Sequence, residues 1–184
     1  MSFILPIITE RLILRDFVED DWRAAYCYAS DPEVVRYMSW GPNDEETTRN
    51  HTLGRLERQA AVSRWDFDLA VILKENNKLI GACGVRVNDM AAGSAELGYA
   101  FNRNYWDHGY ATEAARASIA FGFEQLRLHR IIATCDTENL ASAKVLEKIG
   151  LRREGHFLRN TRRQGEWRDS YYYAILEDEW REVM

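Results

Sequence analysis

The chain has 184 residues, of which 46% are hydrophobic and 29% are charged, and its formal net charge at pH 7 is −5. Because this length suffices for one hydrophobic core, we expect a single domain over residues 1–184. The negative net charge excludes the overall basic field that is typical of nucleic-acid-binding proteins.

The three cysteines, Cys27, Cys83 and Cys135, form no CxxC pair, and the four histidines have no metal-ligand spacing. We therefore expect neither a disulfide framework nor a metal site. The N-terminal residues do not resemble a signal peptide, and no apolar stretch approaches the ~18 residues of a membrane span. These features predict a cytoplasmic protein without membrane contact.

The first third of the chain predicts one strand and two helices. The apolar run Leu12–Arg15 predicts the strand. A helix follows from about residue 20 and ends near Ser30, because Pro32 disfavours helical geometry at the residue that precedes it. A second, mostly polar helix is expected from residue 43 or 44 to about residue 63, exposed on most sides.

The middle of the chain predicts three strands in series. Apolar residues alternate from Trp65 to Leu73, and a polar turn leads to a returning strand over Leu79–Val87. A third strand follows over Ala95–Phe101. Short connections between consecutive strands predict an antiparallel meander.

The last third predicts two helices and three strands. One helix begins after Gly109 and runs to about Leu126, with a stripe of small side chains that permits close packing on a sheet. After a strand over Ile131–Cys135, Asn139 caps a second helix that ends at Gly150. Two final strands, over residues 151–157 and 170–176, are expected to flank a basic loop containing Arg159, Arg162, Arg163 and Gly165. The order of elements predicts an α/β fold with a mixed, mostly antiparallel sheet flanked by helices.

The stretch from Glu96 to Glu113 combines a short strand, a polar turn with Gly109 and the start of a helix. Free N–H groups at such a helix N-terminus, with the positive end of the helix dipole behind them, bind anions. The residues alone therefore predict an anion site. A nucleotide-binding regulatory module is disfavoured, because the chain has neither Gly-Lys-Ser/Thr nor Gly-x-Gly-x-x-Gly.

Several sequence pieces, in one order, resemble the GNAT acetyltransferase superfamily. They are Thr9–Arg15, Glu96–Tyr99, Tyr105–Ala114, Asn139-x-x-Ser142, Val145–Leu151, Trp167-x-Asp169 and Tyr172–Trp180. The similarity is greatest to the ribosomal-protein N-terminal (serine/alanine) acetyltransferase branch, and it covers almost the whole chain. It implies a GNAT-like domain that uses acetyl-CoA as co-substrate and needs no metal.

The resemblance also implies a cofactor site. The family pattern falls on Trp106–Ala111, so backbone N–H groups between Trp106 and Thr112 would hold the pyrophosphate, and the Phe101 N–H would lie where an oxyanion donor is expected. Asp107 departs from the family pattern, because it places a carboxylate near the pyrophosphate. The cofactor-binding residues expected from the resemblance are Tyr99, Phe101, Trp106, His108, Gly109, Tyr110, Ala111, Thr112, Asn139 and Ser142.

Ser142 and Glu96 are the candidate catalytic residues. By resemblance, Ser142 lies beside the CoA sulfur and donates a proton to the leaving thiolate; taken alone, it reads as a capping or solvated hydroxyl. Glu96 is the candidate general base, acting through water, and the strand period places it on the face of Gly98 and Ala100. The alternative for Glu96 is a solvent-facing carboxylate at a strand end. We expect Cys135 to be a buried structural thiol.

Trp40 and Trp167, both expected in loops, are candidates for the wall of the acceptor cleft. An α-amino group has a pKa of about 7.7–8.0, against about 10.4 for lysine, so it needs less help from a base. We therefore expect an acetyl-CoA-dependent N-acetyltransferase that transfers acetyl directly to a primary amine, foremost a protein or peptide N-terminal α-amine.

Two other functions stay open at this point. One is acetylation of a small-molecule amine, such as an amino acid, polyamine or antibiotic, and the other is a non-catalytic acyl-CoA-binding module. The basic loop is either a solvated hairpin tip or a surface for an acidic or phosphate-bearing partner, the CoA 3′-phosphate included. The sequence does not distinguish a monomer from a homodimer.

Overall fold

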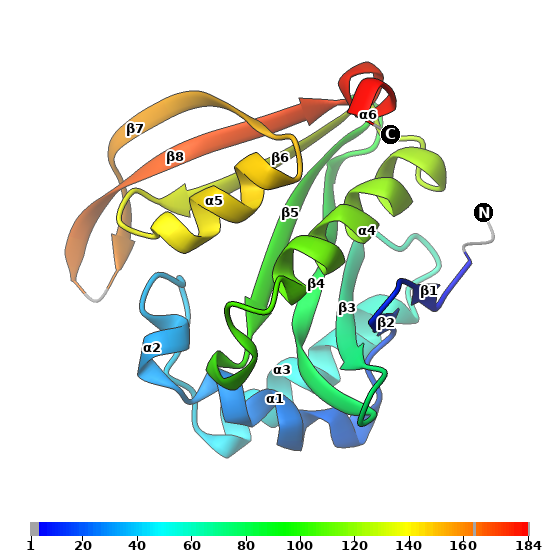
Figure 1. The fold of residues 1–184 in the computed structure, drawn as a ribbon. Coiled ribbons are helices and arrows are strands. Elements are labelled where there is room, and N and C mark those ends of the chain that lie inside the picture. Colours follow the sequence, from blue (N-terminus) through cyan, green and yellow to red (C-terminus); the bar gives the residue numbers. More distant parts are fainter. Residues whose placement is uncertain (1–3, 164, 184) are drawn as a thin grey trace.

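The alternating apolar residues between positions 66 and 101 form the centre of a twisted sheet (Figure 1). The computed structural model describes residues 4–163 and 165–183. Within them the strands form one eight-stranded sheet in the order β1-β2-β3-β4-β5-β6-β8-β7. The strands are β1 (Ile7–Ile8), β2 (Leu12–Arg15), β3 (Asp66–Leu73), β4 (Lys78–Asp89), β5 (Ser94–Phe101), β6 (Arg130–Asp136), β7 (Arg152–Arg163) and β8 (Glu166–Leu176).

The helices lie on both faces of this sheet. They are α1 (Trp22–Ala29), α2 (Pro32–Val35), α3 (Glu45–Gln59), α4 (Tyr110–Glu124), α5 (Leu140–Lys148) and α6 (Glu177–Val183). Short 3₁₀ turns precede α1 and α4, at Glu19–Asp21 and Arg103–Tyr105. None of the helices in this part of the chain has the length and apolar character that crossing a membrane requires.

The sheet is antiparallel at every junction except one, which confirms the predicted mixed, mostly antiparallel α/β fold. The exception is β5 with β6, which run parallel and pair only from Ser94 with Arg130 to Glu96 with Ile132. Beyond Glu96 the two strands part, and Figure 1 shows β6, β8 and β7 leaving the body of the sheet as a separate arm. The sheet is therefore open along one side of β5 from Leu97 onward.

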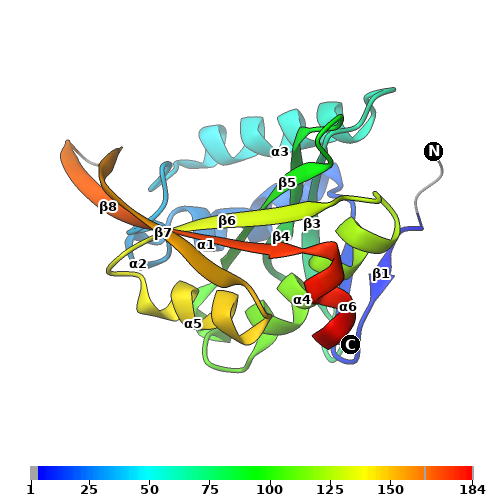
Figure 2. The same ribbon diagram turned by 90° about the horizontal axis from the view of Figure 1, so that it is seen from above.

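The two faces of the sheet meet different helices. On β5, Leu97 and Phe101 belong to the core that also contains α4 residues, whereas Ala100 packs with Ala25 and Tyr28 of α1. Figure 2 shows α3 on one side of the sheet and α4 and α5 on the other. Successive residues of a strand point to opposite faces, so the chain places two different environments on either side of one sheet.

The predicted small-residue stripe of α4 allows this helix to approach the sheet closely. Ala115, Ser118 and Gly122 are all buried. A Cβ atom at Gly122 would lie 2.8 Å from Ile131 Cδ1 of β6, closer than any real contact. Helix α4 is thereby held close against the sheet.

Three sequence-based expectations need correction. Helix α3 ends at Gln59 rather than near residue 63, because the exposed residues that follow offer no apolar face to bury. The prediction of a long basic loop is wrong, because β7 continues to Arg163 and only residues 164–165 separate it from β8. Trp167 consequently lies in β8 and not in a loop. A bulge with Arg159 at φ +48° bends β7 within this extension.

Candidate active site

A cavity of about 820 Å³ lies where β5 and β6 part, and it reaches both faces of the sheet. We call the part lined by the beginnings of α4 and α5 and by Tyr99 the α4/α5 half. We call the part lined by Arg55 of α3, by Asp66 and Asp68 of β3 and by Glu96 and Gly98 of β5 the α3 half. The two halves meet in the gap between the strands, so molecules entering from opposite faces meet there.

The turn before α4 exposes the helix N-terminus to the cavity. Asp107 and Gly109 both have left-handed backbones, with φ +62° and +78°, and Gly109 precedes the first residue of α4. Such a backbone favours glycine, because a side chain there costs about 1–2 kcal/mol. The unpaired N–H groups of the first helical turn and the dipole behind them suit a phosphate.

Arg11 and Glu113 fasten this turn to the N-terminal strands. The Glu113 carboxylate accepts hydrogen bonds from Thr9 Oγ1 at 2.6 Å, the Arg11 backbone N–H at 2.8 Å and Arg11 Nε at 2.7 Å. Arg11 Nη1 in turn donates to the His108 carbonyl oxygen at 2.9 Å. Burial opposes ionisation of Glu113, but these hydrogen bonds outweigh it and lower its pKa.

The open edge of β5 offers backbone groups to the cavity. The Asn102 N–H donates to the Ile80 carbonyl oxygen, which fixes the alternation of the β4–β5 ladder. By that alternation, the N–H groups of Tyr99 and Phe101 point away from β4, toward the side where β6 has parted. The Phe101 carbonyl on that side accepts a hydrogen bond from Trp106 Nε1 at 2.9 Å.

Ser142 meets Tyr99 across the gap. Asn139 caps α5 as predicted, its Oδ1 accepting from the Ser142 N–H at 3.1 Å. Ser142 Oγ lies 2.9 Å from Tyr99 Oη, and Tyr99 Oη also lies 3.3 Å from the Ser142 carbonyl oxygen. Burial raises the pKa of Tyr99, although the hydrogen bond with Ser142 acts in the opposite direction. Tyr99 therefore stays protonated and can donate to Ser142, whose own hydroxyl hydrogen can then be directed toward the cavity-lining Cys135 thiol.

Cys135 lines the cavity near Ser142, at the second-last position of strand β6. Burial, then the neighbouring carboxylates of Asp136 and Glu147, raise the pKa of the Cys135 thiol to about 11. At neutral pH this thiol is protonated and a poor nucleophile.

Glu96 lies in the α3 half, on the same strand face as Gly98 and Ala100, as predicted. Its Oε1 accepts a hydrogen bond from Thr134 Oγ1 of β6 at 3.2 Å. The bond lies just beyond the last paired step between β5 and β6, because Glu96 pairs with Ile132 and Thr134 is two residues further along β6. Glu96 is half-buried at the apex of the gap, where it can accept a proton from a group in the α3 half.

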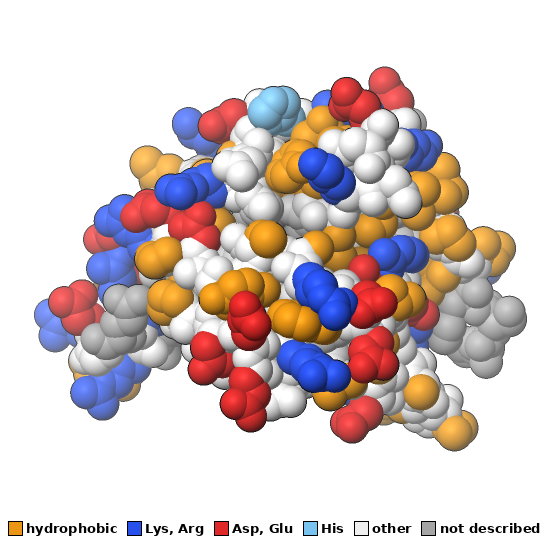
Figure 3. All heavy atoms as spheres, turned by 90° about the horizontal axis from the view of Figure 1, so that it is seen from below, with side chains coloured by type: hydrophobic (Ala, Val, Ile, Leu, Met, Phe, Trp, Pro, Cys, Tyr) orange, Lys and Arg blue, Asp and Glu red, His pale blue; other side chains and the backbone are white. Residues whose placement is uncertain are grey.

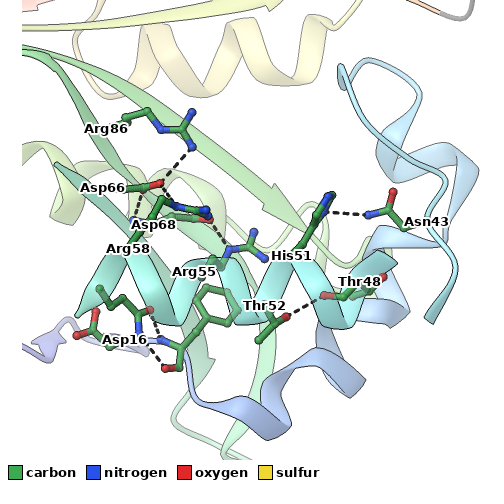
Figure 4. Close-up of polar contacts among 12 residues, drawn as sticks. Asp16, Asn43, Thr48, His51, Thr52, Arg55, Arg58, Asp66, Asp68 and Arg86 are labelled. Atoms are coloured by element: carbon green, nitrogen blue, oxygen red, sulfur yellow. Dashed lines mark hydrogen bonds and ion pairs between the residues drawn. The ribbon is translucent and has the colours of Figure 1, made fainter. Parts of the chain in front are cut away.

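Opposite charges alternate along the floor of the α3 half (Figure 4). Arg55 Nε donates to Asp68 at 2.6 Å, and Arg58 Nε donates to Asp66 at 2.8 Å. Arg86 of β4 adds a third contact, its Nη2 lying 3.2 Å from Asp66 Oδ2. Figure 4 shows Arg55 and Arg58 extending from α3 toward Asp68 and Asp66 on the sheet. These pairs hold α3 on β3 and give the half a mixed, polar surface.

Most of the residues expected at the site line this one cavity. They are Trp40, Glu96, Tyr99, Phe101, Trp106, Gly109, Tyr110, Ala111, Thr112, Asn139 and Ser142. His108 and Trp167 are not among the lining residues: the His108 ring turns back, with Nδ1 2.6 Å from the Trp106 carbonyl oxygen, and Trp167 is 60% exposed. Asp107 lines the cavity and is exposed.

Sequence reasoning missed several lining residues, above all Lys144, Lys148, Asp66 and Asp68. The spacing of Lys144 and Lys148, one helical turn apart on α5, was a usable signal for a basic face. The other two come from a distant strand and have no local pattern that points to the cavity.

Comparisons with known proteins agree with this geometry. Residues 11–152 match the family model described as "Acetyltransferase (GNAT) domain". The chain is 43% identical over 180 residues to the uncharacterized N-acetyltransferase YnaD of Bacillus subtilis, covering 96% of this chain and 99% of that protein. It is 24% identical to the [ribosomal protein uS5]-alanine N-acetyltransferase of Escherichia coli, covering 95% and 92%.

A crystal structure of a GNAT-family acetyltransferase from Bacillus anthracis superimposes with a TM-score of 0.85 at 41% sequence identity, covering 95% of this chain and 99% of that one. The family match spans far more than half of the chain, and the open β5 edge with the exposed α4 N-terminus is in accord with it. The chain belongs to the GNAT family and is an N-acetyltransferase.

Proposed function

We propose that acetyl-CoA binds in the α4/α5 half and that the α-amino group of a protein or peptide N-terminus enters through the α3 half. The observation that carries this proposal is the single cavity that reaches both faces of the sheet beyond Glu96. The co-substrate supplies an acetyl thioester, so the protein has to bring an amine to it and manage two protons.

The α4/α5 half fits the co-substrate. The left-handed Gly109 and the first turn of α4 offer N–H groups to the pyrophosphate, and Lys144 and Lys148 add positive charge along α5. The outward N–H groups of Tyr99 and Phe101 suit the amide groups of the pantetheine arm, which would lie along β5 like an added strand. The Phe101 N–H is the proposed donor to the thioester oxygen.

Transfer is proposed to be direct, without an acyl-enzyme. The protonated Cys135 thiol argues against a covalent route. Ser142, held by Asn139 and hydrogen-bonded to Tyr99, is placed to give its proton to the leaving sulfur, and Tyr99 can replace that proton.

Glu96 is the proposed general base. It lies in the α3 half at the apex of the gap, and its bond from Thr134 holds the carboxylate toward the incoming amine. An α-amine with a pKa of about 7.7–8.0 is largely protonated at pH 7, so a carboxylate acting through water need remove only one weakly held proton.

A protein N-terminus is favoured as acceptor because a ribosomal-protein alanine N-acetyltransferase is among the relatives over nearly the full length. The α3 half is also polar and open, which suits a main-chain segment better than an apolar small molecule. Acetylation of a small amine is the second candidate, and the Glu96 carboxylate, held by the neutral hydroxyl of Thr134, favours it, because it would attract a cationic amine.

A mass-spectrometric screen tests the proposal. Purified protein and acetyl-CoA are incubated with a peptide library of varied N-terminal residues and with a panel of amino acids, polyamines and aminoglycosides. We expect acetylation at peptide α-amines and none on the same peptides with blocked N-termini. Products only among the small amines would favour the second candidate. Tight acetyl-CoA binding with no product in either set would instead indicate a non-catalytic acyl-CoA-binding module.

A further inference from the structure

The guanidinium group of Arg163 lies at the cavity, and two of its nitrogen atoms have no hydrogen-bond partner among the described residues. It is the last residue of β7, at the hairpin end of the molecule, where Figure 3 shows basic side chains gathered (left). Arg163 lines the cavity, and its Nε and Nη1 atoms are buried. Within residues 4–163 and 165–183, neither atom has a hydrogen-bond partner. A buried N–H without an acceptor costs about 1–3 kcal/mol, so such groups normally await a ligand or water.

The Asp136 carboxylate, whose charge acts on Arg163, does not serve as its hydrogen-bond partner, because that carboxylate is already engaged. Asp136 accepts hydrogen bonds from Arg168 at Nε (3.0 Å) and Nη2 (3.3 Å) and from the Glu138 N–H (2.9 Å). Burial is also the main cause that lowers the pKa of Arg163, with the Arg168 charge acting in the same direction and Asp136 against it. Arg163 is therefore an additional positive charge at this place.

The register of the strands places Arg163 in the α3 half. Thr161 pairs with Arg168, so Arg163, two residues along β7, shares the face from which Arg168 reaches Asp136. Asp136 lies two residues beyond Thr134 on β6, which is the residue that holds Glu96. Arg163 pairs with Glu166, nearer the hairpin end than Ser170, which pairs with Asp136, so Arg163 and Glu96 share one face of the sheet, with Arg163 farther toward the hairpin.

We infer, resting on the proposed function, that Arg163 binds a carboxylate of the acceptor while the acceptor amine lies at Glu96. The two charges select a molecule with an amine at one end and a carboxylate some atoms away. That carboxylate belongs either to an acidic side chain next to a peptide N-terminus or to a free amino acid. The pyrophosphate of the co-substrate is not the proposed partner, because its proposed place is at Gly109 in the α4/α5 half, on the other face of the sheet.

Two pairs of acceptors separate these sources. The tripeptide amides Ser-Asp-Ala and Ser-Asn-Ala differ only in the side-chain carboxylate, and serine and serinamide differ only in the α-carboxylate. Each is measured in two ways: by the initial rate of CoA release and by calorimetric binding to the CoA-saturated protein. The variants are Arg163→Gln and Arg163→Lys, with Arg162→Gln as the matched control, because Arg162 is an exposed neighbour on the opposite strand face.

We expect the wild-type protein to prefer the carboxylate member of one pair by about tenfold or more, the usual value of a charged hydrogen bond. Arg163→Gln should reduce this preference to near one, Arg163→Lys should keep part of it, and Arg162→Gln should keep all of it. The KM for acetyl-CoA should stay unchanged in all three variants, which shows that the fold is intact.

The inference is overturned if the wild-type protein prefers neither carboxylate, or if Arg163→Gln retains the preference. Failure of the proposed function gives a different result: the protein releases no CoA from acetyl-CoA with any of the four acceptors. In that case the calorimetric preference, and its loss in Arg163→Gln, still decides whether Arg163 is a carboxylate site.

Discussion

Replacing Glu113 with glutamine should loosen the turn that presents the α4 N-terminus. Glutamine keeps the shape of the side chain, but it removes the charge and turns an N–H₂ group toward the Arg11 N–H donors. One charge-assisted hydrogen bond is then lost, and such a bond contributes about 1.5–3 kcal/mol. Because Arg11 is 42% exposed and regains water, we expect the lower part of this range, about 2 kcal/mol.

A loss of about 2 kcal/mol lowers the melting temperature of a chain of this size by about 4–8 °C. The same change should raise the Kd for CoA several-fold, because Arg11 no longer fixes the His108 carbonyl beside Gly109. Thermal unfolding and calorimetric titration with CoA measure the two effects. Glu124→Gln is the matched control, since this residue is exposed on the last turn of α4.

The pH dependence gives an independent check. Glu113 has a lowered pKa in the folded protein, so its contribution is fully present above its ordinary value of 4.5 and is lost as pH falls through the folded value. The stability gap between wild type and Glu113→Gln should therefore be constant near neutrality and close only below about pH 4.5. Equal melting temperatures and equal CoA affinities at pH 7 would refute the reasoning.

Four further substitutions test the proposed site. Ser142→Ala should lower kcat and leave the KM for acetyl-CoA unchanged in steady-state assays; an unaltered kcat would remove Ser142 from the chemistry. Glu96→Gln should lower kcat at pH 7 and restore it toward pH 8, where an α-amine is neutral without help; a profile like that of wild type would mean that Glu96 is not the base. Asp107→Asn should tighten CoA binding, more at low salt than at high salt, and an unchanged Kd would indicate that its carboxylate is remote from the phosphates. Gly98→Val should raise the KM of the acceptor alone, because a Cβ there meets nothing within 4 Å and the larger side chain fills the α3 half; an equal rise for acetyl-CoA would contradict the division of the cavity.

Local patterns were sufficient to predict most of the fold. The alternation through β3 identifies the residues of the core face, and Asn139 and Gly150 mark the two ends of α5 as predicted. The Gly150 backbone is left-handed, at φ +94°, and the Leu151 N–H donates to the Leu146 carbonyl oxygen, as a helix ending at glycine requires. These signals depend on neighbours within a few residues, so the sequence alone contains them.

The arm of the sheet was harder to predict for a physical reason. Most residues of β7 are exposed on both faces, so no apolar alternation marks the strand, and the bulge at Arg159 interrupts its register. Pairing with β8, rather than burial of its own side chains, keeps β7 extended. A sequence pattern that depends on burial cannot detect such a strand.

Contacts between residues far apart in the chain could not be predicted from the sequence either. Arg11 and Glu113 are 102 positions apart, and only the pairing of β2 with the sheet and the packing of α4 bring them together. Arg163 was assigned to a loop, so its side chain had no predicted direction. The candidate cofactor residues were easier to propose, because most of them lie in one stretch of sequence from Tyr99 to Thr112.

The parting of β5 and β6 has a consequence for how acceptor preference can change. Opposite faces of one sheet carry the two halves of the cavity, so different segments of the chain supply their walls. Exchanging residues 16–63 between relatives would replace the helices over one face and leave α4, α5 and their turn intact. Such chimaeras should change the acceptor range, as far as residues 16–63 line the α3 half, and keep the CoA affinity of the other parent, and this independence would let a single scaffold diversify its targets without rebuilding its acetyl-donor site.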